Sequence, residues 1–278
     1  HGGTLRKAKK GGVGNVDFPD LPMPARPELT RDYSLLLTGV GGTGVVTVGQ
    51  VLGMAAHVEG LVTSVLDVTG LAQKYGAVMS HVRIAPTADH LHATRIADAE
   101  ADAVVGCDLV VTAGDEALLR IKPGTSRVVV ASDLVPTTDF SRNPDWQLDQ
   151  NALIERIRAR CGKDNLLAVE GLRIASRLMG DTLATNMFML GAAWQKGYIP
   201  LSLDSIMRAI ELNGAQVEFN KTSFLWGRRA AVDLDAVEKA AATGSSVKPL
   251  PKRIDMSRDA VVARSMAYLT YYQDEAYA

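Results

Sequence analysis

Cysteine is almost absent from this chain, which contains only Cys107 and Cys161, far apart in the sequence. A four-thiolate iron–sulfur site, a paired CxxC zinc site and a disulfide-rich secreted scaffold all need more cysteines or closer ones. The low count excludes these classes for the chain taken by itself. It also predicts a protein of the reducing cytoplasm.

The chain also lacks an excess of charge of either sign, because 30 Lys and Arg residues balance 31 Asp and Glu residues. Such a chain has no overall field that would attract nucleic acid or an anionic membrane. No apolar run approaches the roughly 18 to 20 residues that cross a bilayer. We therefore expect neither nucleic acid nor a membrane as a partner.

Signatures of self-contained catalysis are lacking too. The sequence has no GxSxG elbow and no GxxxxGK[ST] phosphate loop, and its histidines show no metal-ligand spacing. The first residues, His1 to Lys7, do not resemble a signal peptide and include no initiator methionine. We therefore predict a fragment of a larger protein, with no catalytic and no metal-binding residue of its own.

Short apolar runs that alternate with helical patterns dominate the first part of the chain. The runs expected as strands are 33–38, 61–67, 78–85, 108–113, 127–131 and 165–169. Helical spacing is expected at 43–59, 115–121 and 151–161, and then without further strands at 171–180, 183–197, 203–213 and 216–230. Such alternation is typical of a parallel sheet covered on both faces. It predicts an α/β fold: a Rossmann-like, doubly wound, mainly parallel sheet with a C-terminal helical cap and a helical tail.

Composition also predicts the domain boundaries. Residues 1–31 are rich in glycine, basic residues and proline, which indicates a linker. The α/β domain is expected over 32–242, and a second linker over 243–253. Residues 254–278 form an amphipathic pattern with no stop signal, which predicts the start of a following helical domain.

The sharpest local motif is a GxGxxG loop between the first expected strand and helix. Its residues are Gly39, Gly41, Gly42, Thr43 and Gly44. Glycines there permit a tight turn, and the first amides of the helix would face a phosphate. The alternative is a turn that only packs the helix on the strand.

Dinucleotide and adenylate binding are competing interpretations of this loop. Asp67 stands about where an NAD site places its ribose-binding acid, but the polar segment that follows it is unlike an adenosine-binding turn. Ubiquitin-activating-type adenylating enzymes share the GxGGxG pattern and often add paired zinc cysteines, which are absent here. An independent NAD- or FAD-binding enzyme and a structural module that binds nothing stay open as alternatives.

Ser80 and Arg83 are the polar residues of the third expected strand that need partners. Three positions apart, they point to opposite faces of the sheet. Arg83 could bind a carboxylate or phosphate through its fork of donors, or form a buried ion pair with an acid such as Asp67. Asn186 is interpreted as the single polar residue of a core helix, whereas the helix of Asn220, with Phe219, Phe224 and Trp226, could equally pack against a partner. Neither is interpreted as part of a cofactor site.

Taken together, these segments resemble a known family. The stretches Gly39–Gly44, Leu66–Gly76 with its Thr-Gly-Leu-Ala-Gln-Lys sequence around Gln73, and Ser80–Ile84 are similar to the gamma subunit or gamma domain of 2-oxoacid:ferredoxin oxidoreductases. The form of the second stretch resembles the fused, single-chain indolepyruvate enzymes. The similarity covers roughly residues 33–232 and includes the stretch from Glu218-Phe219-Asn220 through Gly227-Arg228.

The resemblance implies a function for the whole enzyme. That enzyme would decarboxylate indolepyruvate or a related 2-oxoacid on thiamine diphosphate with Mg²⁺, pass electrons through [4Fe-4S] clusters to ferredoxin, and form an acyl-CoA. Its thiamine and iron–sulfur domains would be this chain's partners, and the intact enzyme is expected to be a homo-oligomer. This chain would not catalyse alone. Its expected cofactor-binding residues, with coenzyme A as the candidate ligand, are Gly39, Gly41, Gly42, Thr43, Gly44, Gln73, Ser80 and Arg83.

Overall fold

The computed structural model describes residues 20–69, 76–134 and 149–243, together with Val262 and Met266. The chain divides into two units, His1–Gly244 and Ser245–Ala278. In the second unit, Val262 and Met266 are helical and exposed. The expected linkers and the helical domain over 254–278 fall largely outside the described residues and stay predictions.

A six-stranded sheet forms the centre of the first unit, with the strand order β2-β3-β1-β4-β5-β6. The strands are β1 (Tyr33–Val40), β2 (Val62–Thr69), β3 (Ala77–Ala85), β4 (Ala103–Gly106), β5 (Arg127–Ala131) and β6 (Leu166–Val169). β1, β4, β5 and β6 are parallel neighbours, whereas β3 runs antiparallel to both β1 and β2. The mainly parallel sheet is confirmed, with one reversed strand inserted next to β1.

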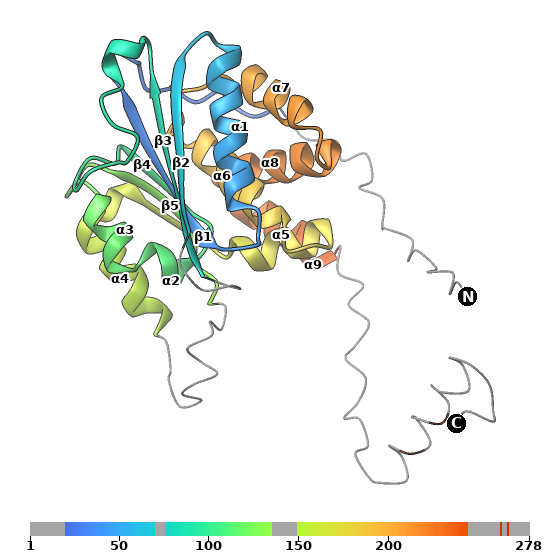
Figure 1. Ribbon diagram of the computed structural model, residues 1–278. Coiled ribbons are helices and arrows are strands. Elements are labelled where there is room, and N and C mark those ends of the chain that lie inside the picture. The colour runs from blue at the N-terminus through green and yellow to red at the C-terminus, as the bar shows by residue number, and fades with distance from the viewer. Residues whose placement is uncertain (1–19, 70–75, 135–148, 244–261, 263–265, 267–278) are drawn as a thin grey trace. The chain divides into compact units, whose positions relative to one another are not determined.

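Helices cover both faces of this sheet (Figure 1). One face carries α1 (Val45–Val58), α5 (Gly171–Met179), α6 (Ala184–Gln195), α7 (Leu203–Asn213), α8 (Val217–Val232) and α9 (Leu234–Thr243). The other carries α2 (Leu109–Thr112), α3 (Asp115–Arg120) and α4 (Gln150–Cys161). Successive side chains of a strand point to opposite faces of the sheet. Leu35 and Leu37 therefore pack in the hydrophobic core on the α1 face, and Leu36 packs in the core on the other face. The doubly wound α/β fold with its C-terminal helical cap is therefore confirmed.

The expected strand over 108–113 is wrong. The strand lies earlier, at β4, and Asp108 instead caps α2 by accepting a hydrogen bond from the Val111 amide at 2.8 Å. A short apolar run does not distinguish a buried strand from a buried helical turn by periodicity. Here the run forms a helix, and the N-terminal cap that Asp108 provides favours it over a strand. Helix α9 was not expected at all.

Helix α6 lies at the centre of the helical cap, with all of its residues buried. It crosses α8 at two glycines, one from each helix. A Cβ atom on Gly191 would lie 2.0 Å from the Phe224 carbonyl oxygen, and one on Gly227 would lie 1.8 Å from that of Phe188. The two backbones touch, so neither position has room for a side chain.

No helix in the described residues is both long enough and apolar enough to cross a bilayer.

This crossing generates a stability prediction. Gly191→Ala and Gly227→Ala should each lower the free energy of unfolding by about 2 kcal/mol or more, because overpacking outweighs the gain in helix propensity. Urea denaturation would measure the loss. The matched control is Gly49→Ala in α1, where the nearest atoms are at an ordinary 3.4 Å; it should be neutral or stabilising. A loss in the control equal to that in the α6 and α8 variants would contradict the packing argument.

Candidate functional site

The glycine loop lies between β1 and α1, as expected, and its backbone needs glycine at two positions. Gly42 and Gly44 have φ of +83° and +92°, in the left-handed region. The turn is closed by the Gly41 amide, which donates to the Gly76 carbonyl oxygen at 2.8 Å, and by Thr43 Oγ1, which donates to the Val40 carbonyl oxygen at 2.7 Å. The loop is thus held in one shape with Gly42 exposed.

Gly39 has a different role in the same loop. A Cβ atom there would lie 2.5 Å from Val45 Cγ2 and 3.3 Å from the Cys107 Cβ. Because glycine has no Cβ atom, α1 can begin in close contact with β1 and with the residue that follows β4. Of the two interpretations of this motif, close packing holds for Gly39, while Gly42 in the same loop is exposed.

The first turn of α1 follows immediately and has no acidic residue. Within the described part of the chain, the amides of Gly42, Gly44, Val45 and Val46 have no hydrogen-bond acceptor. Leading amides of a helix carry partial positive charge and suit an anion. This end of α1 therefore offers donors without a competing carboxylate.

A cavity of about 120 Å³ lies beside the loop, between α1, α6 and the start of α8. It is lined by Thr43, Gly44, Thr47, Val48, Leu183, Asn186, Met187, Ala215, Gln216, Phe219 and Asn220. None of these residues is charged. At this volume the cavity holds only part of a cofactor-sized molecule, since sites for whole ligands are usually about 300 Å³ or larger.

Two asparagines that the sequence interpretation left out of the site belong to this cavity. Asn186 Nδ2 donates to the Thr43 carbonyl oxygen at 2.6 Å, which ties α6 to the glycine loop. Asn220 Nδ2 donates to the Ala215 carbonyl oxygen at 2.8 Å, at the turn before α8. For Asn186 the signal in the sequence is a lone amide in an otherwise apolar segment, whose partner comes from a distant part of the chain. Asn220 stands in a polar segment and bonds locally, so its neighbours gave no such signal.

Ser80 lies in mid-sheet on the face that carries α1. Its Oγ donates to a carboxylate oxygen of Asp67, the neighbouring residue on β2. A Cβ on Gly49 of α1 would approach its side chain at 3.5 Å. Asp67 therefore serves a strand-to-strand hydrogen bond, two strands away from the glycine loop that follows β1.

Arg83 lies on the opposite face and at the opposite end of the sheet from the glycine loop. It is paired in register with Ser34, near the start of β1, whereas the loop follows the end of β1. Its Nε donates to Asp32 Oδ2 at 3.1 Å in an ion pair. The expected opposite facing of Ser80 and Arg83 is what the structure shows, but Arg83 pairs with Asp32 instead of Asp67. Arg83 and the loop are not brought together, and Gln73 lies outside the described residues.

His81 is a buried neighbour of Arg83 on the same strand. Its Nδ1 accepts a hydrogen bond from the Ile96 amide at 3.2 Å, and its Nε2 has no partner among the described residues. Burial first, and then the positive charges of Arg95 and Arg120, lower the pKa of His81 to about 4. The imidazole is thus neutral at physiological pH.

Thiol and metal chemistry have little support in the described residues. Burial, with the charge of Asp108 second, raises the pKa of Cys107 to about 12, so its thiol is neutral. Burial also raises the pKa of Cys161. No group of three or more His, Cys, Asp or Glu side chains that could hold a metal ion occurs in the ranges that the structure describes.

Comparisons with known proteins identify the relatives of this arrangement. The family described as pyruvate ferredoxin/flavodoxin oxidoreductase matches residues 34–230. The indolepyruvate oxidoreductase subunit IorB of Pyrococcus horikoshii is 26% identical over 212 residues, which cover 73% of this chain and 98% of the relative. The family match spans the sheet and most of the helical cap.

Two solved structures share the fold. Pyruvate oxidoreductase subunit PORC of Thermotoga maritima superposes with a TM-score of 0.52 at 19% identity, over 72% of this chain and 97% of that one. The 2-oxoglutarate:ferredoxin oxidoreductase of Magnetococcus marinus, with 2-oxoglutarate, coenzyme A and succinyl-CoA bound, gives a TM-score of 0.53 at 18% identity, over 73% of this chain and 31% of that one.

The buried imidazole generates a prediction of pH dependence. Its pKa falls from 6.5 to about 4 on folding, so the unfolded chain binds the proton first and stability is lost as pH falls from 6.5 towards 4. The loss should reach about 3 kcal/mol of unfolding free energy. In His81→Gln, which keeps an acceptor for Ile96, this part of the loss should disappear from urea titrations across the range. His57 is exposed, so His57→Gln should lose as much unfolding free energy as wild type between pH 6.5 and 4. If His81→Gln also loses as much as wild type, the buried imidazole is not the cause of the loss.

Proposed function

The chain belongs to the pyruvate ferredoxin/flavodoxin oxidoreductase family, and from that premise we propose that it is the non-catalytic gamma part of a 2-oxoacid:ferredoxin oxidoreductase of the indolepyruvate type. The observation that carries the proposal is the family match over residues 34–230, which spans the sheet and most of the helical cap. A relative named as an indolepyruvate oxidoreductase subunit is covered over 98% of its length, which supports the subunit role.

The cofactors of such an enzyme belong to other regions of it. Thiamine diphosphate with Mg²⁺ supplies an electron sink for decarboxylation, and [4Fe-4S] clusters carry the electrons. The residues described here do not fit these groups: a cluster needs four thiolates, the chain has two cysteines, and the described residues gather no metal-binding set. We therefore propose the thiamine and iron–sulfur regions, and ferredoxin, as partners, in a cytoplasmic homo-oligomer.

Dinucleotide binding is disfavoured by the sheet order. In an NAD site the acid that holds the ribose ends the strand next to the glycine loop. Here β3 separates β2 from β1, and Asp67 is hydrogen-bonded to Ser80. We do not propose the NAD or FAD alternative.

Reconstitution tests the proposed function. The catalytic regions of the enzyme, purified without this chain, should reduce ferredoxin slowly or not at all with indolepyruvate, and addition of the chain should restore the rate. Pyruvate and 2-oxoglutarate serve as control substrates and should be used less well. The same rate with and without the chain would overturn the subunit assignment, and a preference for pyruvate would overturn the indolepyruvate type.

For the ligand, we propose that the exposed glycine loop and the first turn of α1 contact the phosphates of coenzyme A. Support comes from the unpaired amides of Gly42 and Gly44, from the absence of an acid in that turn and from the uncharged cavity alongside. We leave Arg83 out of the proposed contact, because it is paired with Asp32 at the far end of the sheet.

Charge placed in the first turn of α1 tests this contact. Thr47→Glu puts a carboxylate at the cavity wall, where it suits the helix itself but repels phosphate. Thr47→Gln is the uncharged control of the same size. Calorimetric titration of the complete enzyme with coenzyme A should show affinity at least about tenfold weaker in Thr47→Glu, a cost of about 1.4 kcal/mol, and little change in Thr47→Gln.

A distant control completes the experiment. Arg83→Met removes a positive charge from the opposite end of the sheet, so it should leave coenzyme A affinity unchanged even where it lowers stability. If Thr47→Glu binds coenzyme A as wild type does, the loop does not contact the phosphates. If Arg83→Met alone weakens binding, the ligand lies elsewhere.

A further inference from the structure

Arg228 of α8 is buried where the cap meets the segment before β1. Only 6% of the residue is exposed. Its guanidinium lies over the Trp194 ring, 4.7 Å from the centroid, and its Nε donates to Gln195 Oε1 at 2.9 Å. Gln195 Nε2 in turn donates to the Pro22 carbonyl oxygen at 2.6 Å. The guanidinium is therefore held in one orientation by neutral groups.

This arginine has no counter-ion in the described residues. No carboxylate of those residues forms an ion pair with Arg228, and burial alone lowers its pKa, with no neighbouring charge contributing. Two other arginine side chains that are about as well covered differ in this respect, since Arg83 pairs with Asp32 and Arg120 with Asp98. A buried charge without a partner destabilises a fold. The terminal nitrogens of Arg228 are not among the fully buried atoms that lack a partner, so they are open to a carboxylate from outside these residues.

The chemistry of the free atoms indicates what that partner is. With Nε engaged by Gln195, the two terminal nitrogens remain, and a fork of donors matches the two oxygens of a carboxylate. The guanidinium itself carries one positive charge. That balances one carboxylate, whereas a phosphate dianion calls for more donors and more charge.

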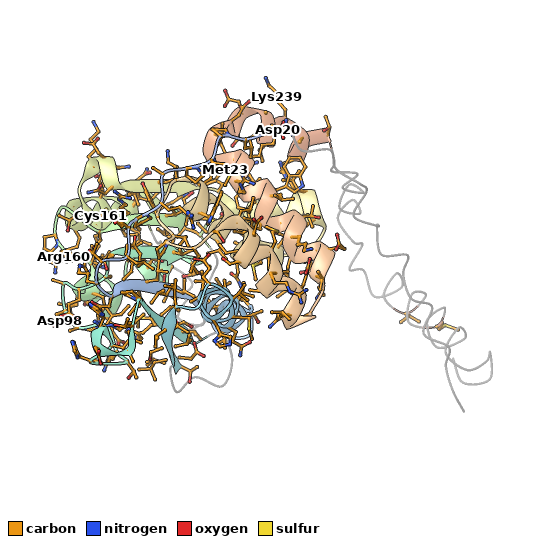
Figure 2. All side chains as sticks on the ribbon, turned by 90° about the horizontal axis from the view of Figure 1, so that it is seen from above. Asp20, Met23, Asp98, Arg160, Cys161 and Lys239 are labelled. Atoms are coloured by element: carbon orange, nitrogen blue, oxygen red, sulfur yellow. The ribbon has the colours of Figure 1, made fainter. Side chains whose placement is uncertain are left out.

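The surroundings resemble a protein contact more than a small-molecule pocket. Met23, next to the Pro22 that Gln195 contacts, is 66% exposed, and Figure 2 places it by the C-terminal helices. Val232, one helical turn after Arg228 on α8, is 49% exposed. Exposed apolar side chains beside an arginine that stacks on an aromatic ring are typical of interface centres.

We propose that Arg228 is an electrostatic anchor that receives an Asp, Glu or C-terminal carboxylate from a catalytic region of the same enzyme. The inference rests on the proposed function, because that function supplies the partner. The carboxylate neutralises the guanidinium on the Trp194 ring, and Met23 and Val232 are covered in the same contact.

The test compares Arg228→Met in the free chain and in the assembled enzyme. In the free chain the variant should melt at the wild-type temperature or above it, since the charge that is removed has no carboxylate partner among the described residues. In reconstitution, the concentration of chain that gives half-maximal ferredoxin reduction should rise at least about tenfold. Added NaCl should raise that concentration for wild type more steeply than for the variant.

Matched variants separate the anchor from general effects. Arg229→Met removes the next arginine of α8, which lies over the Trp226 ring at 5.5 Å and is less buried; its half-maximal concentration should stay near wild type. Arg228→Lys keeps the charge and loses the fork, so it should fall between wild type and Arg228→Met.

Two outcomes would overturn the anchor. In one, Arg228→Met assembles as tightly as wild type. In the other, Arg228→Met lowers the melting temperature of the free chain while Arg229→Met weakens assembly equally, which makes the arginine a structural residue. In both outcomes the wild-type chain still restores ferredoxin reduction, so the proposed function stands. If the wild-type chain restores no activity, the proposed function itself is wrong.

Discussion

The contact between the backbones of α6 and α8 holds both sites of this molecule in place. Gly191 and Gly227 let the helices touch at the carbonyl oxygens of Phe224 and Phe188, and α6 is buried along its whole length as a result. One end of α6 carries Asn186, which holds the glycine loop through Thr43. The other end carries Gln195, which holds Arg228.

Helix α8 also contributes to both regions. Its first turns bring Phe219 and Asn220 to the cavity, and its later turns bring Arg228 to Trp194. Because helices are rigid over this length, the two crossing glycines fix the position of the loop-side cavity relative to the arginine on the far side of the cap. The proposed ligand contact and the proposed partner contact thus lie on one pair of helices, at opposite ends of their crossing.

The reversed strand β3 decides what kind of ligand site the glycine loop can be. It separates β2 from β1, so the acidic residue that follows a usual nucleotide pattern, Asp67, stands two strands away and bonds to Ser80. Charge is arranged accordingly: the cavity lining carries none, and Arg83 is neutralised by Asp32 at the other end of the sheet. What remains at the loop is a set of backbone amides, the kind of donors that suit an anion in the proposed contact.

The sequence alone determined the sheet class, nearly all the helices and the glycine loop, because each depends on local periodicity, on turn residues and on a glycine-specific backbone. It also determined the family, through the joint spacing of three short segments. The placement of β4 and α2 escaped it, since an apolar run fits either structure until Asp108 caps the helix. Only the tertiary structure decided that, among the described residues, Arg83 has a carboxylate partner and Arg228 has none, and that Asn186 reaches Thr43 across the fold. The reason is physical: the partners of buried polar groups come from distant parts of the chain, and no local pattern encodes which distant residue will stand opposite.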